Sequence, residues 1–398
     1  MSYTFLWVST ALLCGILLGA WLASLLRKKN NQQKFEQLNH RYFKGLNYLL
    51  NDESDKAIDV FIQLAETSHE TFEPQLALGN LYRRKGEVDR AIKLHQALIS
   101  QPNLPEKYRT RALLAIGKDY MSAGLLDRAE VLFSELVELE VHTPEALMAL
   151  TDIYQQEQDW QEAIRSAKRF QNVSKRQMHV PIAHYYCELA DLAWGQEDLE
   201  GAEKNLASAL RVDERCARAL ITQAEIKVAQ TDLQAALDLY HLAVKADKDY
   251  LPLFIDDMAA CFLELGQGAA LESWLLSLME TYHGVSPILT LAKWYESEKG
   301  ATFAADFVEQ QLQKRASVRG LNALLELNLS KEDGSPDDVQ DVNQKYFEVL
   351  KSLVNKLLKG KPQLRCRKCG FGARQKHWQC PSCKNWDVVK PIYGLESE

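Results

Sequence analysis

A small residue returns at nearly constant intervals through most of the chain, and this periodicity restricts the possible folds more than any other feature. The matching alanines are Ala57, Ala91, Ala129, Ala163, Ala202, Ala236, Ala270 and Ala304. Successive members are 34, 38, 34, 39, 34, 34 and 34 residues apart. A period of this size indicates stacked structural repeats, in which each repeat buries its apolar face against its neighbours.

Mostly small residues stand twelve positions before these alanines, and mostly large ones stand four positions after them. The first three such pairs are Gly45 with Phe61, Gly79 with His95, and Gly117 with Phe133. A small residue lets two helices touch, and a large one fills the gap between layers. We therefore interpret these residues as packing residues, and His95 as a core histidine rather than a metal ligand.

A period of 34 residues is the length of the tetratricopeptide repeat, a pair of antiparallel helices. The sequence therefore predicts an all-α superhelix over residues 40–329, with about eight repeats and an extra helix at Leu321–Leu329. The two longer steps fall where prolines stand, and the extra residues there lengthen a turn between repeats without breaking the stack. The prolines are Pro102, Pro105 and Pro181.

Superhelices of this kind hold partners on a concave face, which by analogy is lined by the first helix of each repeat. Four basic residues fall on the first helices of the second and third repeats: Arg83, Arg84, Arg111 and Lys118. They are candidates for a basic patch that binds an acidic peptide. The alternative is an ordinary solvated face.

Four cysteines near the C-terminal end form two pairs, Cys366-x2-Cys369 and Cys380-x2-Cys383. Two such loops can direct four thiolates at one tetrahedral ion, and four thiolates suit iron as well as zinc. Gly370 follows the first pair, whereas Lys384 occupies the corresponding glycine position after the second. We predict a closed structural site for one iron or zinc ion at residues 361–398, and a redox dithiol is the alternative. Trp378 and Trp386 flank the second pair and are expected to shield the metal.

The cysteine segment is basic, although the chain as a whole has a formal net charge of -7. Cations near the segment offset the negative charge of four thiolates around a divalent ion. Nucleic-acid binding is the alternative interpretation of a basic metal ribbon. Because the chain is acidic overall, we expect no nucleic-acid partner.

An apolar run of 22 residues without a charge, Phe5–Leu26, stands near the N-terminus. As a helix it would extend about 33 Å, enough for a bilayer core of about 30 Å. Basic residues follow the run at 27–29 and none precedes it, which predicts an uncleaved single-pass anchor at residues 1–26 with its N-terminus outside and the body cytoplasmic. Gly15 and Gly19 belong to a stripe of small residues that favours a helix partner in the membrane.

Two connecting segments complete the predicted organisation. Residues 27–39 form a juxtamembrane linker that holds the body close to the membrane. Residues 330–360 contain an acidic turn-rich linker and then an amphipathic helix that ends at Gly360. Its apolar stripe is Val342, Tyr346, Leu350, Leu353 and Leu357. We expect this stripe to cover the end of the repeats or to pack on the metal module, so that the module docks on the repeats.

The sequence contains no Walker loop, no His-Glu-x-x-His, no Gly-x-Ser-x-Gly and no dinucleotide fingerprint. The remaining cysteines, Cys14, Cys187, Cys216 and Cys261, are scattered and suit core or lipid-facing positions in a reducing compartment. We therefore expect a non-enzymatic protein with no catalytic residues.

The order of an anchor, tetratricopeptide repeats and a rubredoxin-like cysteine module resembles the lipopolysaccharide assembly protein B family of Gram-negative bacteria. Four stretches carry the resemblance: Leu78–Gln96 (LGNLYRRKGEVDRAIKLHQ), Phe43–Leu50 (FKGLNYLL), His184–Ala190 (HYYCELA) and Cys380–Trp386 (CPSCKNW). The resemblance covers essentially the whole chain.

The resemblance implies an inner-membrane adaptor that works with the membrane protease FtsH. Such an adaptor promotes degradation of LpxC, the deacetylase that commits precursor to lipid A, and so regulates lipopolysaccharide synthesis. It also implies that Cys366, Cys369, Cys380 and Cys383 bind the metal. Other membrane-side assembly proteins are implied as partners, and a homo-oligomer stays possible. The alternatives are a general scaffold for envelope-synthesis proteins, a nucleic-acid binder and, last, a redox enzyme.

Overall fold

The computed structural model describes residues 40–51, 53–67, 72–329, 338–395 and 397–398, with the side chains of 338–345 left out. These residues form two compact units. The first comprises the described residues up to 158 together with 172–175, and the second comprises 159–171 and the described residues from 176 onward. The predicted repeat domain at 40–329 therefore contributes to both units. Its boundaries stay a prediction.

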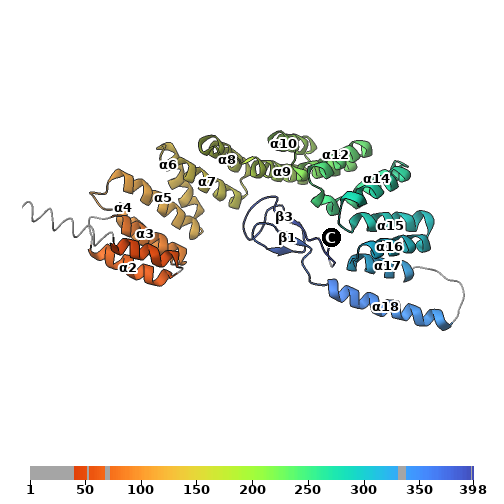
Figure 1. Ribbon diagram of the computed structural model, residues 1–398. Helices are drawn as coiled ribbons and strands as arrows, with labels where there is room; N and C mark the ends of the chain where they lie inside the picture. The colour runs from red at the N-terminus through yellow and green to blue at the C-terminus, as the bar shows by residue number, and fades with distance from the viewer. Residues whose placement is uncertain (1–39, 52, 68–71, 330–337, 396) are drawn as a thin grey trace, which may run out of the picture. The chain divides into compact units, whose positions relative to one another are not determined.

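The first unit consists of helices joined by short turns (Figure 1). Its elements are a helix over residues 40–50, α2 (Ser54–Thr67), α3 (Phe72–Arg84), α4 (Val88–Ile99), α5 (Glu106–Ser122), α6 (Leu126–Glu138) and α7 (Thr143–Glu157).

The second unit begins with further helix pairs, which are followed by a single helix, α17. Its elements are α8 (Trp160–Ser174), whose last residues group with the first unit, α9 (His179–Gly195), α10 (Leu199–Val212), α11 (Ala217–Ala229), α12 (Leu233–Ala246), the 3-10 helix η1 (Lys248–Leu253), α13 (Ile255–Glu264), α14 (Gly268–Thr281), α15 (Ser286–Lys299), α16 (Ala301–Lys314) and α17 (Val318–Leu329). The predicted extra helix is confirmed as α17, which begins three residues earlier than expected.

The predicted small-to-large pairs pack as expected. A Cβ atom on Gly45 would lie 2.8 Å from the Phe61 ring, and one on Gly117 would lie 2.6 Å from the Phe133 ring. Gly79 packs in the same way against His95, which is fully buried, so its assignment to the core is confirmed. Each glycine is needed because the ring of the following helix occupies the space of its side chain.

Seven of the eight repeat alanines are fully buried, and the exception is Ala270. The buried alanines are Ala57, Ala91, Ala129, Ala163, Ala202, Ala236 and Ala304. Ala270 is exposed, and α14 instead buries Leu271, Leu275 and Leu278. The alanine match is therefore one residue out of register there. The leucines, spaced four and three residues apart, define the apolar stripe of that helix.

The remaining helix, α18 (Asp338–Leu358), packs on α17 and ends before Gly360, whose φ of +92° suits a helix stop (Figure 1). The prediction that its apolar stripe is covered is wrong for the described side chains. Tyr346 is 65% exposed and Leu357 is 55% exposed, whereas Val354, which is not in the predicted stripe, is buried. The predicted stripe residue Val342 and the predicted linker at 330–337 lie outside the described side chains.

The chain ends in a three-stranded antiparallel sheet, in the order β2-β1-β3, formed by β1 (Leu364–Cys366), β2 (Gly372–Ala373) and β3 (Val389–Pro391). This small sheet and the loops that join its strands form the cysteine module. In the part of the chain that the structure describes, no helix is both long enough and apolar enough to cross a bilayer. The predicted anchor at 1–26, with Gly15 and Gly19, and the linker at 27–39 lie outside that part.

We predict that Gly117→Ala destabilises the chain by about 1–3 kcal/mol, because the new methyl group overlaps the Phe133 ring. Gly195→Ala is the matched control, since a Cβ atom there meets nothing within 4 Å. Urea unfolding followed by circular dichroism measures both variants. Equal stability of the two variants would contradict the packing described for this pair.

Candidate metal centre

The first cysteine pair lies on the hairpin that joins β1 to β2. Cys366 ends β1, and the backbone N–H of Gly370 donates to the Cys366 carbonyl oxygen at 3.0 Å. Gly370 has a φ of +80°, as the sequence analysis expected of a glycine at this position. The turn brings the backbone N–H groups of Lys368 and Cys369 to 3.4 Å from the Cys366 Sγ.

The second pair repeats this geometry without a glycine. The backbone N–H of Lys384 donates to the Cys380 carbonyl oxygen at 2.9 Å, and Lys384 has a φ of +56°. A lysine in the left-handed region is less favourable than a glycine. Its backbone carbonyl also accepts a hydrogen bond from Gln379 at 3.0 Å, which helps to hold the turn.

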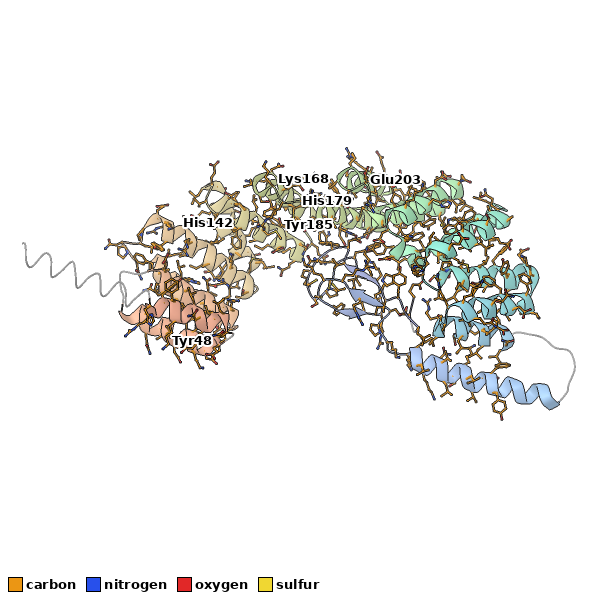
Figure 2. All side chains as sticks on the ribbon, viewed as in Figure 1. Tyr48, His142, Lys168, His179, Tyr185 and Glu203 are labelled. Carbon is orange, nitrogen blue, oxygen red and sulfur yellow. The ribbon has the colours of Figure 1, made fainter. Side chains whose placement is uncertain are left out.

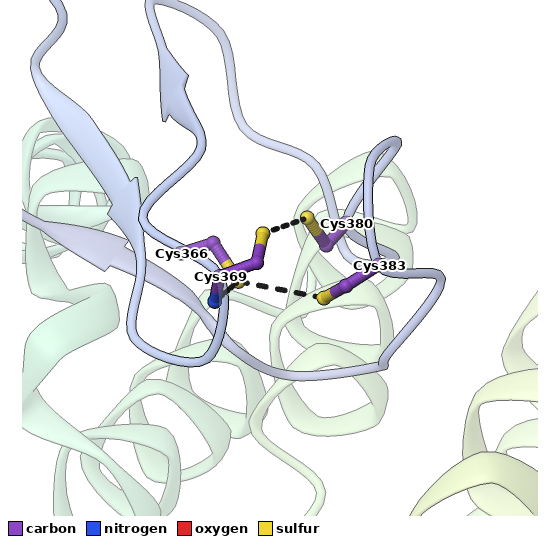
Figure 3. Close-up of side chains that lie close together, drawn as sticks. All are labelled: Cys366, Cys369, Cys380 and Cys383. Atoms are coloured by element: carbon purple, nitrogen blue, oxygen red, sulfur yellow. Dashed lines mark hydrogen bonds between the residues drawn. The ribbon is translucent and has the colours of Figure 1, made fainter. Parts of the chain in front are cut away.

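The two turns bring the four sulfur atoms together (Figure 3). The Cys366 and Cys383 Sγ atoms are 3.7 Å apart, the Cys369 and Cys380 Sγ atoms are 3.6 Å apart, and all four lie within 4.8 Å of one another. A tetrahedral ion with metal–sulfur bonds of about 2.3 Å places its sulfur ligands about 3.8 Å apart. The cluster therefore fits one four-coordinate ion, and four protein sulfurs would leave no coordination position open for a substrate.

The surroundings of the thiols differ, as do their pKa values. The backbone N–H of Asn385 lowers the pKa of Cys383 to about 6, and that of Phe371 lowers the pKa of Cys369. Burial raises the pKa of Cys380 to about 11. Because metals bind thiolates, the two donor-assisted sulfurs are already suited to be ligands, whereas Cys380 would need the charge of a bound ion to lose its proton.

An aromatic contact docks the module on α9 and the start of α8. The Trp386 ring is stacked on the His184 ring at 5.0 Å, with an angle of 20° between the planes. Tyr185, labelled in Figure 2, and Trp160 lie edge-on to Trp386 at 5.8 and 6.4 Å. Trp386 thus packs on the repeats, and Trp378 likewise packs 5.0 Å from the Tyr250 ring. The two tryptophans that were expected to shield the metal serve as docking residues.

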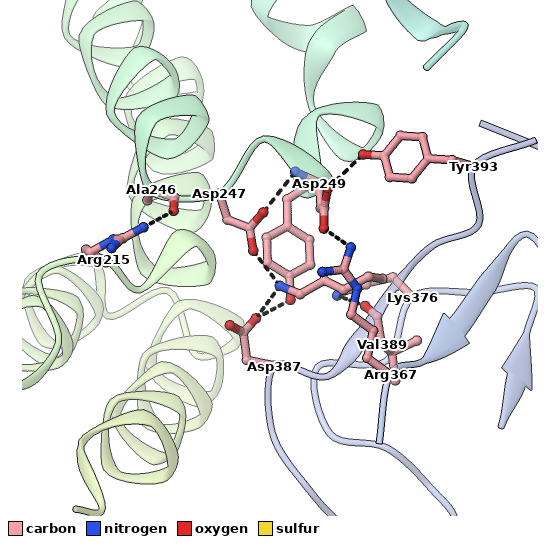
Figure 4. Close-up of polar contacts among 11 residues, drawn as sticks. Arg215, Ala246, Asp247, Asp249, Arg367, Lys376, Asp387, Val389 and Tyr393 are labelled. Carbon is pink, nitrogen blue, oxygen red and sulfur yellow. Dashed lines mark hydrogen bonds and ion pairs between the residues drawn. The ribbon is translucent and has the colours of Figure 1, made fainter. Parts of the chain in front are cut away.

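Polar contacts join the module to the segment around η1 (Figure 4). Lys390 Nζ, which is buried, lies 2.6 Å from Asp247 Oδ2 and 3.1 Å from Asp387 Oδ1. Asp387 also accepts a hydrogen bond from the hydroxyl of Tyr250, and the Lys390 ammonium lies 3.7 Å from the centre of the Tyr250 ring. This buried cation therefore has a carboxylate from each side of the contact.

A second acidic residue of the segment around η1 fastens the outer part of the module. Asp249 pairs with Arg367 at 2.5 Å and accepts a hydrogen bond from the Tyr393 hydroxyl at 2.7 Å. Acidic residues of the repeats thus pair with basic residues of the module. These pairs account for two of the basic residues of the module, Arg367 and Lys390.

The last residue, Glu398, makes a further contact with the repeats. Its carboxylate accepts hydrogen bonds from the Ser286 backbone N–H at 3.0 Å and the Ser286 hydroxyl at 2.8 Å, at the first residue of α15. Arg319 lies 2.9 Å from the same carboxylate, and the Tyr282 hydroxyl lies 3.1 Å from it. A carboxylate at a helix N-terminus satisfies backbone donors that lack partners and interacts favourably with the helix dipole.

The predicted basic patch is distributed over several contacts in the first unit. Arg83 lies 2.6 Å from the fully buried Asp119, which also lies 2.6 Å from His95 Nδ1, so Arg83 is committed to an internal network. Arg111 pairs with Glu73 at 3.4 Å. Arg84 is exposed and Lys118 is half-buried. Two of the four candidates are therefore paired with acidic residues of the repeats, and the basic patch stays a prediction.

Sequence reasoning did not find the docking residues of the repeats. His184 and Tyr185 stood in a stretch that resembled the family, without an assigned role, and Asp247, Asp249 and Tyr250 belonged to no motif. Their partners in the module lie between about 118 and 202 positions later. A local sequence pattern cannot predict a contact between residues so far apart in the chain.

The model of the rubredoxin metal binding domain family matches residues 365–391, and tetratricopeptide repeat models match residues 76–107, 146–170 and 187–250. The chain is 33% identical over 379 residues to the lipopolysaccharide assembly protein B of Escherichia coli K12, with 95% of this chain and 96% of that protein covered. The chain belongs to the lipopolysaccharide assembly protein B family. The Haemophilus influenzae member is 29% identical at the same coverage.

A solved structure, the C-terminal part of a tetratricopeptide repeat-containing protein from Cytophaga hutchinsonii, is 12% identical with a TM-score of 0.39. It covers 71% of this chain and 99% of that one. This likeness is too weak to bear on the function of the family member described here.

One docking residue has an unusual environment. His184 is buried, and its Nδ1 atom has no hydrogen-bond partner among the described residues. Burial lowers the pKa of His184 well below its ordinary value of 6.5, and the nearby cations Arg218, Lys376 and Lys390 lower it further. The histidine is therefore neutral in the folded chain.

We predict that His184→Phe reduces the loss of stability on acidification. Below about pH 6.5 the unfolded wild-type chain gains a proton at this position that the folded chain does not, so its stability falls as the pH falls. The variant keeps a ring on Trp386 and has no proton to gain. Its stability relative to wild type should increase by up to about 1.4 kcal/mol per pH unit between pH 6 and 5, measured by urea unfolding.

The exposed His283 supplies the control, since His283→Phe should leave the pH dependence of the wild type unchanged. If His184→Phe and wild type lose stability in parallel on acidification, the buried neutral histidine is not a source of the dependence.

Proposed function

We propose that this chain is a non-enzymatic adaptor at the bacterial inner membrane that regulates lipopolysaccharide synthesis. In this proposal it presents the deacetylase LpxC to the membrane protease FtsH and so promotes its degradation. The observation that carries the proposal is the match over 95% of the chain to relatives that are themselves named lipopolysaccharide assembly protein B. Binding repeats together with a closed cysteine centre suit an adaptor better than a catalyst.

The proposed location depends on residues 1–26 as a single membrane-spanning helix, with the N-terminus periplasmic and the rest of the chain cytoplasmic. The stripe that contains Gly15 and Gly19 would then face a membrane partner, either FtsH, a regulator or a second copy. The short linker at 27–39 would keep the repeats beside the membrane. Tethering raises the effective concentration of a bound soluble substrate near a membrane protease.

The proposed metal ligands are Cys366, Cys369, Cys380 and Cys383, holding one iron or zinc ion. The sulfur separations of 3.6 and 3.7 Å support this assignment, and the closed donor set supports a structural role. The ion would hold the module in the shape that presents Trp386 and Lys390 to the repeats.

Partner binding is proposed for the repeat surface rather than for the module. Of the four basic candidates, Arg84 and Lys118 are the ones whose side chains have no acidic partner among the contacts found, whereas Arg83 and Arg111 pair with acidic residues of the repeats. An acidic segment of a partner is the ligand class that such a surface would bind. We propose no nucleic-acid partner.

We predict that depletion of this protein in its native cell lengthens the half-life of LpxC severalfold, because the protease loses the factor that concentrates its substrate. The measurement is a pulse-chase or translation-arrest immunoblot of LpxC. Re-expression of the wild-type chain should restore the short half-life, and a chain with all four module cysteines replaced by serine should not.

An unchanged LpxC half-life on depletion would contradict the adaptor mechanism. Co-purification of envelope-synthesis proteins without a change in half-life would favour the general scaffold. A version with residues 1–26 replaced by an unrelated anchor keeps the chain tethered to the membrane but loses any specific contacts of the native helix. The LpxC half-life in cells with this version therefore separates the two effects.

A further inference from the structure

Helix α18 carries more apolar surface than it buries. Among the described side chains of α18, Val354 is the buried one, at 6% exposed. The helix packs on α17, and Lys351 Nζ lies 3.4 Å from Glu326 Oε1 of α17. On its other side five large apolar side chains are between 48% and 65% exposed: Tyr346, Val349, Leu350, Leu353 and Leu357. Side chains project from α18 on the side away from the other helices of this unit (Figure 2).

These five residues form one continuous surface. At about 100° per residue they occupy an arc about 100° wide, adjacent to the side that contacts α17. Glu348 and Ser352 lie on the polar side of the helix, whereas Lys356 lies about 20° from Val349 and flanks the arc. An amphipathic helix that buries only one edge of its apolar arc has a second apolar surface available for another partner. We call the five residues the outer face of α18.

The charges around the outer face are strongly one-sided. Between Asp338, where α18 begins, and Lys376 the chain has ten basic residues and three acidic residues, Asp338, Asp341 and Glu348, in a protein whose formal net charge is -7. The basic residues are Lys345, Lys351, Lys356, Lys359, Lys361, Arg365, Arg367, Lys368, Arg374 and Lys376. Lys351 and Arg367 already pair with Glu326 and Asp249, and Lys376 lies 3.8 Å from the centre of the Tyr250 ring, so these three are not counted among the cations available to a partner. Arg374 is exposed and donates to the Gly360 carbonyl oxygen at 3.0 Å, so this cation lies at the end of α18.

We propose that the outer face of α18 lies in the headgroup layer of a bilayer that contains anionic phospholipid, with the nearby basic side chains against the phosphates. An apolar arc flanked by lysines and arginines is the pattern of helices that lie in the plane of a membrane surface. The proposal rests on the membrane location in the proposed function. It adds a second attachment point, in a part of the chain far from residues 1–26.

Charge decides between lipid and a second copy of the chain. Two copies of α18 packed through their outer faces would bring two basic segments together, and each copy offers only Asp338, Asp341 and Glu348 against ten basic residues. An anionic bilayer supplies phosphates to all the exposed cations and hydrocarbon to the apolar arc. Of these two occupants, only the anionic bilayer complements both properties of the face.

The test uses the full chain with a genetically encoded, environment-sensitive fluorescent amino acid, which leaves the native cysteines untouched. The probe replaces Leu353 on the outer face, and in a matched control it replaces Ser352 on the polar side. Each protein is reconstituted in vesicles of phosphatidylcholine alone or of phosphatidylcholine with phosphatidylglycerol, with or without brominated acyl chains.

We expect the probe at 353 to shift its emission to the blue and to be quenched severalfold by brominated lipid in the phosphatidylglycerol vesicles. High salt should reverse part of this quenching, and the probe at 352 should show neither effect. A water-exposed probe at 353, equal quenching in phosphatidylcholine alone, or self-quenching between copies would each overturn the proposal.

Vesicle flotation of the same samples separates this proposal from the proposed function. A chain that floats while the probe at 353 stays in water keeps its anchor and contradicts the lipid contact of α18. A chain that does not float with either vesicle contradicts both. A change in LpxC half-life is measured independently of either result.

Discussion

The cysteine module is too small to fold by apolar burial, and this constraint connects the sulfur cluster to the repeats. Its own core consists of Leu364, Cys366, Ala373, Cys380 and Val389. Two of these five residues are proposed metal ligands, so an ion would stand at the centre of what little core exists. Domains of this size usually need a metal or another cross-link to be stable. The module has a second source of stability, which is the surface of α9 and η1.

Residues of the repeats in the second unit also form the docking surface for the cysteine module. His184 of α9 and Tyr250 of η1 contact tryptophans of the module. The buried Lys390 is tolerable because Asp247 faces it from the repeats. Removing one member of such a buried pair leaves an uncompensated charge, which usually costs several kcal/mol. The module and the repeats of this unit therefore depend on each other.

The repeat period and the cysteine spacing could be predicted from the sequence because both are local patterns with one physical meaning. The same reasoning failed at Ala270, where it followed a residue type instead of the leucine spacing that α14 buries. It also failed at Leu357, which was expected to be covered by the repeats or the module and is exposed. An apolar stripe does not identify the surface that covers it. The docking residues could not be predicted from the sequence. Asp247 and Lys390 belong to no shared sequence motif, and they come into contact only in the folded chain.

Hydrogen–deuterium exchange with and without bound metal tests the coupling between the sulfur cluster and the repeats most directly. If the ion, the module and the docking surface form one unit, removal of the metal by a chelator increases exchange at residues 364–391. It also increases exchange in α9 and η1, while α3–α6 of the first unit stay unchanged. An increase confined to residues 364–391 would contradict this account, because the repeats would then be indifferent to the module.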